Sequence, residues 1–241
     1  ILKWYKKENK MPKFLLLENV GNMISKKFKS SYDKWVSHLD KNGYYTITFT
    51  EKLNSKKFGS PQNRQRVFAL SFLKKSFRNI TDWKKIENQI RDSLILQDNL
   101  INYKNLFDWF VNDVKHTSAK EKNECIVPKT PSRYKGIDRM KKYIYDLDSP
   151  KTMPPHIPTL TTKQDRFPNS GFVKVGHWYR FLTPRETLLA MGFKNEDVNN
   201  ILNDVIQHKK EVLWKQAGNS ISVNVLEKIF SEMLKVGGQN E

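Results

Sequence analysis

The sequence contains one cysteine, Cys125, so no intrachain disulfide can form. It lacks any run near the roughly 20 apolar residues that a membrane-spanning helix needs, and its first residues do not have the pattern of a signal peptide. Its histidines are too scattered for a metal site: His38, His116, His156, His177 and His208. These absences argue against a disulfide-stabilised secreted protein, a membrane protein and a structural metal, so we expect a cytoplasmic protein.

Acidic residues are also scarce, with 25 Asp and Glu against 43 Lys and Arg, which gives a formal net charge of +18. This excess favours a polyanionic partner, and nucleic acid is the first candidate. A Lys-rich bias of the whole proteome would produce the same excess, so charge alone leaves both explanations open. Hydrophobic residues make up 38% of the chain, which is enough for a folded core.

The segment ILKWYKKENK at 1–10 resembles the end of a helix that is already under way, because no capping residue precedes it. The first residue is Ile rather than Met. We therefore expect that the sequence is a fragment or one half of a split protein.

The first third of the chain alternates like an α/β protein. An apolar run predicts a buried strand of a parallel sheet at 14–20, and β-branched and aromatic residues predict strands at 44–50 and 66–72. Between these strands we expect an amphipathic helix at 31–43 and a loop at 54–65. This order indicates part of an open α/β sheet.

The middle of the chain is less regular. A helix is expected at 82–95, but residues 97–175 mix Pro, Lys and aromatic residues with little periodicity. A structureless segment of this length is unusual inside a compact domain. We therefore expect a small, loop-rich domain inserted into the α/β fold.

Regular structure returns at 180–193. Thr183, Pro184 and Glu186 have the spacing of a helix start with a capping box. A second short helix is expected at 195–206.

Three groups of residues carry possible chemistry, and the first is Glu18 with Asn19. They follow the first expected strand directly, at the strand end where open α/β sheets place their ligands. A carboxylate there can accept an N–H from a bound base or share a proton with it. The alternative is that Glu18 only caps the following turn.

The second group is Gln62, Arg64 and Arg66, which alternate at the entry to a strand. Alternation is expected to place them on one face or along one edge of a cleft. Two guanidinium groups there suit phosphate or carbonyl oxygens, because each donates N–H groups in a fixed plane. A solvated or ion-paired strand edge explains the same pattern.

The third group is Gly218, Asn219 and Ser220. We expect Asn219 or Ser220 to cap a helix that runs to Gly237, so that backbone N–H groups face a ligand. The pattern is weak, and a plain helix cap is its more frequent explanation.

Taken in order, these segments resemble the second half of a DNA cytosine C5-methyltransferase. ENV at 18–20 resembles the family's Glu-Asn-Val motif, QNRQR at 62–66 its Gln-x-Arg-x-Arg motif, and AGNSISV at 217–223 its final cofactor-side motif. PTLTT at 158–162 with RFLTPRE at 180–186 resembles the segments that flank its target recognition domain. The resemblance covers nearly the whole chain and is closest to bacterial, mollicute-like members.

The resemblance implies an α/β fold that is the C-terminal part of a Rossmann-like methyltransferase sheet. Residues 1–74 would form the second half of the catalytic domain, 75–176 the target recognition domain, and 177–241 the hinge and the helices that return to the catalytic domain. The recognition domain would read double-stranded DNA from the major groove, in the bacterial cytoplasm. The candidate DNA contacts are Gln62, Thr161, Thr162, Lys163, Gln164, Arg166 and Arg180.

The resemblance also implies catalytic roles. Glu18 would hold the N3 and N4 edge of a cytosine flipped out of the duplex, and protonation of N3 would make C6 a better electrophile. Asn19 would fix the loop beside it. Arg66 would bind the cytosine carbonyl oxygen, and Arg64 would brace the loop or a phosphate.

S-adenosylmethionine is the methyl donor that the resemblance implies, with Gly218, Asn219 and Ser220 closing one side of its pocket. In this family most of that pocket comes from a Gly-rich loop, and the cysteine of a Pro-Cys dipeptide attacks C6. Neither motif is present, and no Pro precedes Cys125, which we interpret as a small hydrophobic residue. Without a thiolate the chain alone is expected to be inactive.

Two hypotheses follow. The chain is the C-terminal subunit of a methyltransferase that is complemented by an N-terminal subunit, or it is a catalytically inert DNA-binding module or gene remnant. A basic RNA-associated α/β protein would explain the charge but not the order of the motifs.

Overall fold

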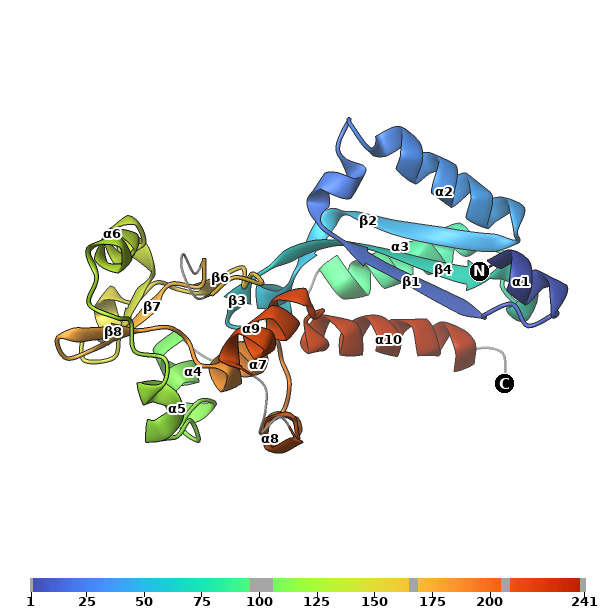
Figure 1. Cartoon of the computed structure of the whole chain (residues 1–241). Helices are drawn as coiled ribbons and strands as arrows, with labels where there is room; N and C mark the ends of the chain where they lie inside the picture. Colours follow the sequence, from blue (N-terminus) through green and yellow to red (C-terminus); the bar gives the residue numbers. More distant parts are fainter. Residues whose placement is uncertain (1, 96–105, 165–168, 205–208, 239–241) are drawn as a thin grey trace. The chain divides into compact units, whose positions relative to one another are not determined.

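The computed structural model describes residues 2–95, 106–164, 169–204 and 209–238 (Figure 1).

The chain forms two compact units. The first unit comprises Ile1–Asn54, Gln65–Asp98 and Leu226–Glu241, and the second comprises Ser55–Arg64 and Asn99–Val225. This division differs from the expected boundaries after residues 74 and 176. The segment 65–98 belongs with the sheet, and most of the segment after 176 belongs with the loop-rich region.

The first unit is built on a three-stranded sheet with the order β1-β4-β2. Its strands are β1 (Phe14–Asn19), β2 (Tyr44–Asn54) and β4 (Gln65–Leu73). The middle strand, β4, pairs antiparallel with both neighbours. The expectation of a parallel sheet is therefore wrong for these pairings. Strands β1 and β2, which the strand–helix–strand segment connects, run in the same direction. Strand β4 lies between them and runs in the opposite direction.

Strand β1 is an edge of this sheet, because among the described residues only β4 pairs with it. Its side chains are half-buried up to Glu18, whereas β4 is buried from Val67 to Leu73. The near-continuous apolar sequence of β4 thus fits a central strand that is covered on both faces.

Helices cover both faces of the sheet. Besides its strands, the first unit contains α1 (Leu2–Lys7), η1 (Gly21–Ile24), α2 (Lys29–Lys41), η3 (Lys74–Ser76), α3 (Trp83–Ile95) and most of α10 (Val223–Gly238). On one face, Leu39 of α2 is buried against Tyr44 and Leu73. On the other, Trp83 of α3 stacks on Tyr45 with 5.3 Å between ring centroids. Neighbouring residues of a strand face opposite sides, and Figure 1 accordingly shows α2 and α3 on opposite faces.

The second unit combines short strands and short helices. Its strands are β3 (Gln62–Asn63), β5 (Ile144–Asp146), β6 (Ile157–Pro158), β7 (Phe172–Val175) and β8 (Trp178–Arg180). Its helices are η2 (Ser55–Phe58), α4 (Leu106–Asn112), α5 (Ala119–Asn123), α6 (Pro131–Arg139), η4 (Lys141–Tyr143), η5 (Pro150–Thr152), α7 (Pro184–Ala190), α8 (Asn195–Asp204) and α9 (Lys210–Asn219). β3 pairs with β6, and the other strands form a sheet in the order β5-β7-β8. Within the described residues, no helix has the length and apolar content that crossing a membrane requires.

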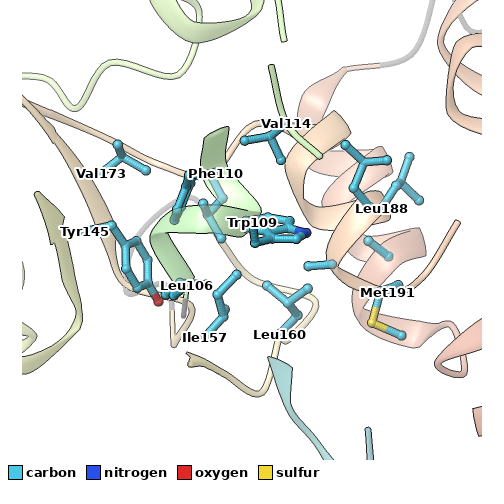
Figure 2. Packing of buried hydrophobic residues seen from close by; sticks show 14 of the residues in the cluster. Leu106, Trp109, Phe110, Val114, Tyr145, Ile157, Leu160, Val173, Leu188 and Met191 are labelled. Atoms are coloured by element: carbon cyan, nitrogen blue, oxygen red, sulfur yellow. The ribbon is translucent and has the colours of Figure 1, made fainter. Parts of the chain in front are cut away.

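Two buried clusters form the core of the second unit. The larger one gathers Trp109 of α4, Tyr145 of β5, and Leu188 and Met191 from α7 and its C-terminal end (Figure 2). The smaller one includes Cys125. The region that looks irregular in sequence therefore has a hydrophobic core of its own.

Helix α7 begins with the capping box that the sequence predicts. The Thr183 hydroxyl accepts a hydrogen bond from the Glu186 N–H, and the Glu186 carboxylate accepts one from the Thr183 N–H at 2.8 Å. The same carboxylate forms two hydrogen bonds with the guanidinium of Arg180, at 2.7 and 2.8 Å. The Arg180 and Glu186 side chains are 4% and 0% exposed, so this is a desolvated, bidentate ion pair.

Replacing Glu186 with glutamine is expected to lower the free energy of unfolding by about 3–5 kcal/mol, because Arg180 would stay buried without its counter-charge. Urea denaturation measures the loss. Glu196→Gln removes an exposed carboxylate from α8 and serves as the control, with an expected change within about 0.5 kcal/mol. Equal stability of the two variants would contradict the structural role of this pair.

The C-terminal region contains two helices where the sequence predicted one. Asn219 ends α9 and Ser220 is its C-terminal cap, with the Ser220 N–H bonded back to the Gln216 carbonyl at 2.9 Å. Helix α10 begins only at Val223. The expected start at Asn219 or Ser220 is therefore wrong, because these residues close the preceding helix.

Candidate functional site

An ion pair between Glu18 and Arg66 joins the end of β1 to the start of β4. The Arg66 Nε lies 3.0 Å from the Glu18 Oε1, and both side chains are 17% exposed. The strand register explains the pairing: Glu18 lies opposite Phe68, so Arg66 is its diagonal neighbour on the same face of the sheet. Burial lowers the pKa of the Arg66 guanidinium, and the Glu18 carboxylate opposes this effect. The sequence singles out both residues but does not predict that they pair.

This pair has a defined chemical capacity. A carboxylate accepts hydrogen bonds from N–H groups, its protonated form can deliver a proton, and a guanidinium donates to a carbonyl oxygen. Because the two groups are adjacent and partly shielded from water, they can engage the polar edge of one planar ligand.

Asn19 organises the turn that follows Glu18. Its side-chain oxygen accepts a hydrogen bond from the N–H of Val20 at 2.8 Å. This local bond fixes the path of the chain as it leaves β1. The alternative that Glu18 caps the turn is not observed, because Asn19 supplies that bond and Glu18 pairs with Arg66.

An apolar groove of about 400 Å³ lies beside Asn19 in the first unit. Its lining includes Leu17, Val20, Phe28 and Trp35. Val20 and Phe28 are 50% and 44% exposed, which is unusual for large apolar side chains. Sequence reasoning missed the groove because it is formed by β1, η1 and α2 together, and no local pattern marks it.

Gln62 lies in the interior of the second unit with 0% exposure. Its Oε1 accepts a hydrogen bond from the Leu160 N–H at 2.8 Å, and its Nε2 lies 3.0 Å from the Met191 sulfur. A direct contact with DNA would require Gln62 to leave these partners.

Arg64 braces the backbone of the second unit. Its guanidinium donates to the carbonyl oxygens of Leu160, Gly218 and Ser220, at distances of 3.0, 3.1 and 2.9 Å. Of the two roles expected for Arg64, these contacts fit the bracing of a loop.

The predicted common face of Gln62, Arg64 and Arg66 is therefore not formed. β3 ends at Asn63 and β4 begins at Gln65, so the segment is not one continuous strand and its side chains do not simply alternate. Gln62 and Arg64 make their contacts in the second unit, and Arg66 makes its ion pair in the first.

Gly218, Asn219 and Ser220 lie at the C-terminal end of α9, which presents carbonyl groups rather than the expected N–H groups. The carbonyl oxygens of Gly218 and Ser220 bind Arg64, and Asn219 is exposed. Asn219 thus has the exposed side chain of the three, and the Ser220 hydroxyl donates to the Ala217 carbonyl at 2.8 Å. Their contact with S-adenosylmethionine stays a prediction.

Gly218 is required by packing. A Cβ at this position would lie 2.5 Å from the Thr161 carbonyl carbon. Gly218→Ala is therefore expected to lower the free energy of unfolding by about 1–3 kcal/mol, measured by urea denaturation. Gly238→Ala is the matched control because nothing lies within 4 Å of its Cβ position. If Gly218→Ala lowers the free energy of unfolding no more than Gly238→Ala does, the close approach of Thr161 to Gly218 is contradicted.

The remaining candidate DNA contacts differ in exposure. Thr162 and Lys163 are exposed and Thr161 is half-buried. Arg166 lies outside the described residues. Thr162 and Lys163 thus remain accessible candidates.

Gln164 and Arg180 are buried instead. Gln164 is 2% exposed and bonds to the Thr161 carbonyl and the Ser170 hydroxyl, while Arg180 is held by Glu186. Both were expected at DNA, but their observed contacts are internal to the second unit.

Cys125 is 1% exposed in the smaller core cluster. Burial raises the pKa of its thiol to about 12. It packs as a small apolar side chain, as predicted. The described residues also contain no group of three His, Cys, Asp or Glu side chains placed to bind a metal ion.

Comparison with known proteins agrees with the motif order. The family model described as C-5 cytosine-specific DNA methylase matches residues 6–235. The type II methyltransferase M2.ScrFI of Lactococcus lactis subsp. cremoris is 32% identical over 230 residues, which cover 95% of this chain and 56% of that protein. The orphan methyltransferase M.SssI of Spiroplasma monobiae is 30% identical over 238 residues, covering 96% and 55%. The chain thus spans about half the length of these relatives.

Solved structures show the same fold. The S. pombe Dnmt2 methyltransferase has a TM-score of 0.62 at 16% identity, with 94% of this chain and 68% of that chain covered. The Entamoeba histolytica methyltransferase EhMeth has a TM-score of 0.61 at 17% identity, with 93% and 63% covered. These similarities support the α/β methyltransferase fold.

Proposed function

Because the chain belongs to the C-5 cytosine-specific DNA methylase family, we propose that it supplies the base-holding part of an enzyme that methylates C5 of cytosine in duplex DNA. The observation that carries the proposal is the ion pair of Glu18 and Arg66 at the end of β1. The turn held by Asn19 adjoins it.

The pair matches the polar edge of cytosine, which presents a carbonyl oxygen at C2, an acceptor at N3 and an amino group at N4. Glu18 accepts a hydrogen bond from the N4 amino group, and in its protonated form, after taking a proton from solvent, it passes that proton to N3 and returns to the carboxylate, while Arg66 donates a hydrogen bond to the C2 oxygen. Both contacts withdraw electron density from the ring, so C6 becomes more open to nucleophilic attack. The ion pair holds both side chains in place before the base arrives.

The attacking nucleophile lies outside these 241 residues. Attack on C6 needs a thiolate, and the thiol of Cys125 is buried and has a raised pKa. We therefore propose that the chain works with a complementing part that carries the Pro-Cys dipeptide. That part also supplies most of the site for S-adenosylmethionine, which provides the methyl group. It belongs to the same polypeptide or to a second subunit.

Double-stranded DNA is the proposed macromolecular substrate. The formal charge of +18 suits a polyanion, and bases are reached after extrusion from the duplex. The second unit, with its own hydrophobic core, is the proposed recognition module.

The test is transfer of a labelled methyl group to duplex DNA by the complemented chain, followed by analysis of the modified nucleoside. The expected product is 5-methylcytosine. Label on N4 of cytosine or N6 of adenine would overturn the proposal.

A catalytically inert DNA-binding module is the second candidate. It is favoured by the second unit, whose core does not involve Glu18 or Arg66. Sequence-selective DNA binding by a complemented chain that transfers no methyl group would support it.

A further inference from the structure

The hairpin formed by β7 and β8 ends in an exposed apolar tip. Val175 and Trp178 are 52% and 46% exposed, and they lie opposite each other in the register. The two residues between them, Gly176 and His177, are exposed as well. Gly176 has φ +55°, and nothing lies within 4 Å of its Cβ position, so a side chain at this point of the turn would face open space.

The tip continues a buried face of the same hairpin. Val173 and Arg180 also lie opposite each other and are 0% and 3% exposed. Side chains two residues apart share a face of a strand, so Val175 and Trp178 extend this face beyond the core. Half of each of these two apolar side chains is left outside the core, and such exposure at a projecting tip indicates an external partner.

Positive charge surrounds the tip. The Lys129 ammonium lies 3.6 Å from the centre of the Trp178 ring, a cation–π contact. Helix α6 reaches the hairpin through Tyr134, whose ring meets that of Tyr179 at 6.2 Å. The segment 129–142 carries six cations and one acid: Lys129, Arg133, Lys135, Arg139, Lys141, Lys142 and Asp138.

Two of the acidic groups near this hairpin are paired with lysines, while Asp148 also acts on Lys174 from nearby. Asp138 pairs with Lys141 at 3.5 Å, and Asp146 pairs with Lys174 of β7 at 2.7 Å. The surface around the apolar tip is therefore net positive, which suits a partner that presents phosphates around a flat apolar surface.

We propose that the tip of the β7–β8 hairpin enters a groove of duplex DNA, and that Trp178 contacts the bases there and sets a base preference. A two-stranded ribbon fits the major groove, and aromatic or apolar side chains contact base faces and thymine methyl groups. The exposed Lys129 and Lys135 hold the flanking phosphates. This inference rests on the proposed function for its choice of partner, and it assigns recognition to residues beyond those expected from the motifs.

The experiment uses the full 241-residue chain and a pool of duplexes with randomised central positions, sequenced before and after selection. The unmodified chain is expected to enrich a short motif. Trp178→Ala is expected to lose enrichment at one or two adjacent positions, with affinity for the enriched duplex reduced about 10-fold or more. Trp178→Phe is expected to keep part of the preference because it retains an aromatic ring.

Two controls separate this effect from loss of structure or charge. Trp4→Ala removes another exposed tryptophan, 57% exposed in α1, and is expected to leave enrichment unchanged. Lys135→Ala is expected to leave the enriched motif unchanged. It is expected to reduce the slope of log affinity against log salt concentration by about 1, the amount that corresponds to one lost phosphate contact. A thermal melt equal to that of the unmodified chain shows that Trp178→Ala is folded.

The inference is overturned if Trp178→Ala enriches the same motif as strongly as the unmodified chain, or if the unmodified chain enriches none. Methyl transfer by the complemented chain reports separately on the proposed function. If the complemented chain methylates C5 but the enriched motif does not depend on Trp178, the hairpin inference is refuted and the proposed function stands. If the enriched motif depends on Trp178 but the complemented chain transfers no methyl group to C5, the proposed function is refuted and the hairpin inference stands.

Discussion

Replacing Glu18 with glutamine is expected to lower the rate of methyl transfer by the complemented chain about 10²–10⁴-fold. A glutamine side chain can still accept the N4 hydrogen of cytosine and donate to N3, so it preserves the hydrogen bonds to the base. It cannot deliver a proton to N3, so C6 is not activated. DNA binding is therefore expected to persist while transfer is lost, which separates activation from binding.

Single-turnover methyl transfer and duplex binding, measured on the same preparation, test this expectation. Glu227→Gln removes an exposed carboxylate from α10 and is expected to leave both unchanged. A Glu18→Gln enzyme that transfers methyl groups at the normal rate would remove Glu18 from the mechanism. Parallel loss of binding and transfer would instead indicate that the side chain acts only in holding the base.

The second large effect concerns the nucleophile: the chain by itself is expected to transfer no methyl group. At pH 7.5, a thiol with a pKa of about 12 is thiolate in a fraction on the order of 10⁻⁵, and Cys125 is also 1% exposed. A chimaera in which this chain replaces the matching part of M2.ScrFI is expected to be active. Radiolabel transfer to duplex DNA compares the two.

Cysteine replacements locate the nucleophile within that chimaera. Cys125→Ser is expected to leave transfer unchanged, whereas serine in place of the Pro-Cys cysteine of the added part is expected to abolish it. Methyl transfer by the isolated chain, or dependence of the chimaera on Cys125, would contradict the proposal that the thiolate lies elsewhere.

Local features were predictable from sequence. The capping box of Thr183 and Glu186 depends on residues three apart, and the structure confirms it at both hydrogen bonds. The expected strands and the helix at 31–43 are also present, because hydrophobic periodicity depends on neighbours within one element.

Long-range features were not predictable. The insertion of β4 between β1 and β2 depends on sheet topology, which a local pattern does not encode. Arg64 binds carbonyl groups that lie 96, 154 and 156 residues later in the chain. Its alternation with Arg66 suggested a shared face, but the break between β3 and β4 removed the basis for that expectation.

The candidate site shows the same limit. Motif order singled out Glu18 and Arg66, but only the register of β1 on β4 makes them diagonal neighbours. Trp178 carried no sequence signal, because its exposure follows from the length of the hairpin relative to the core beneath it.

The open edge of β1 bears on how such a protein can be produced in a cell. Among the described residues, one side of this strand keeps its backbone N–H and C=O groups without a neighbouring strand. Such an edge is a template on which newly made copies stack into aggregates. On the proposal that a complementing part completes the sheet at β1, synthesis of the chain in excess over that part is expected to lead to inclusion bodies, and matched dosage of the two parts is expected to raise the soluble yield.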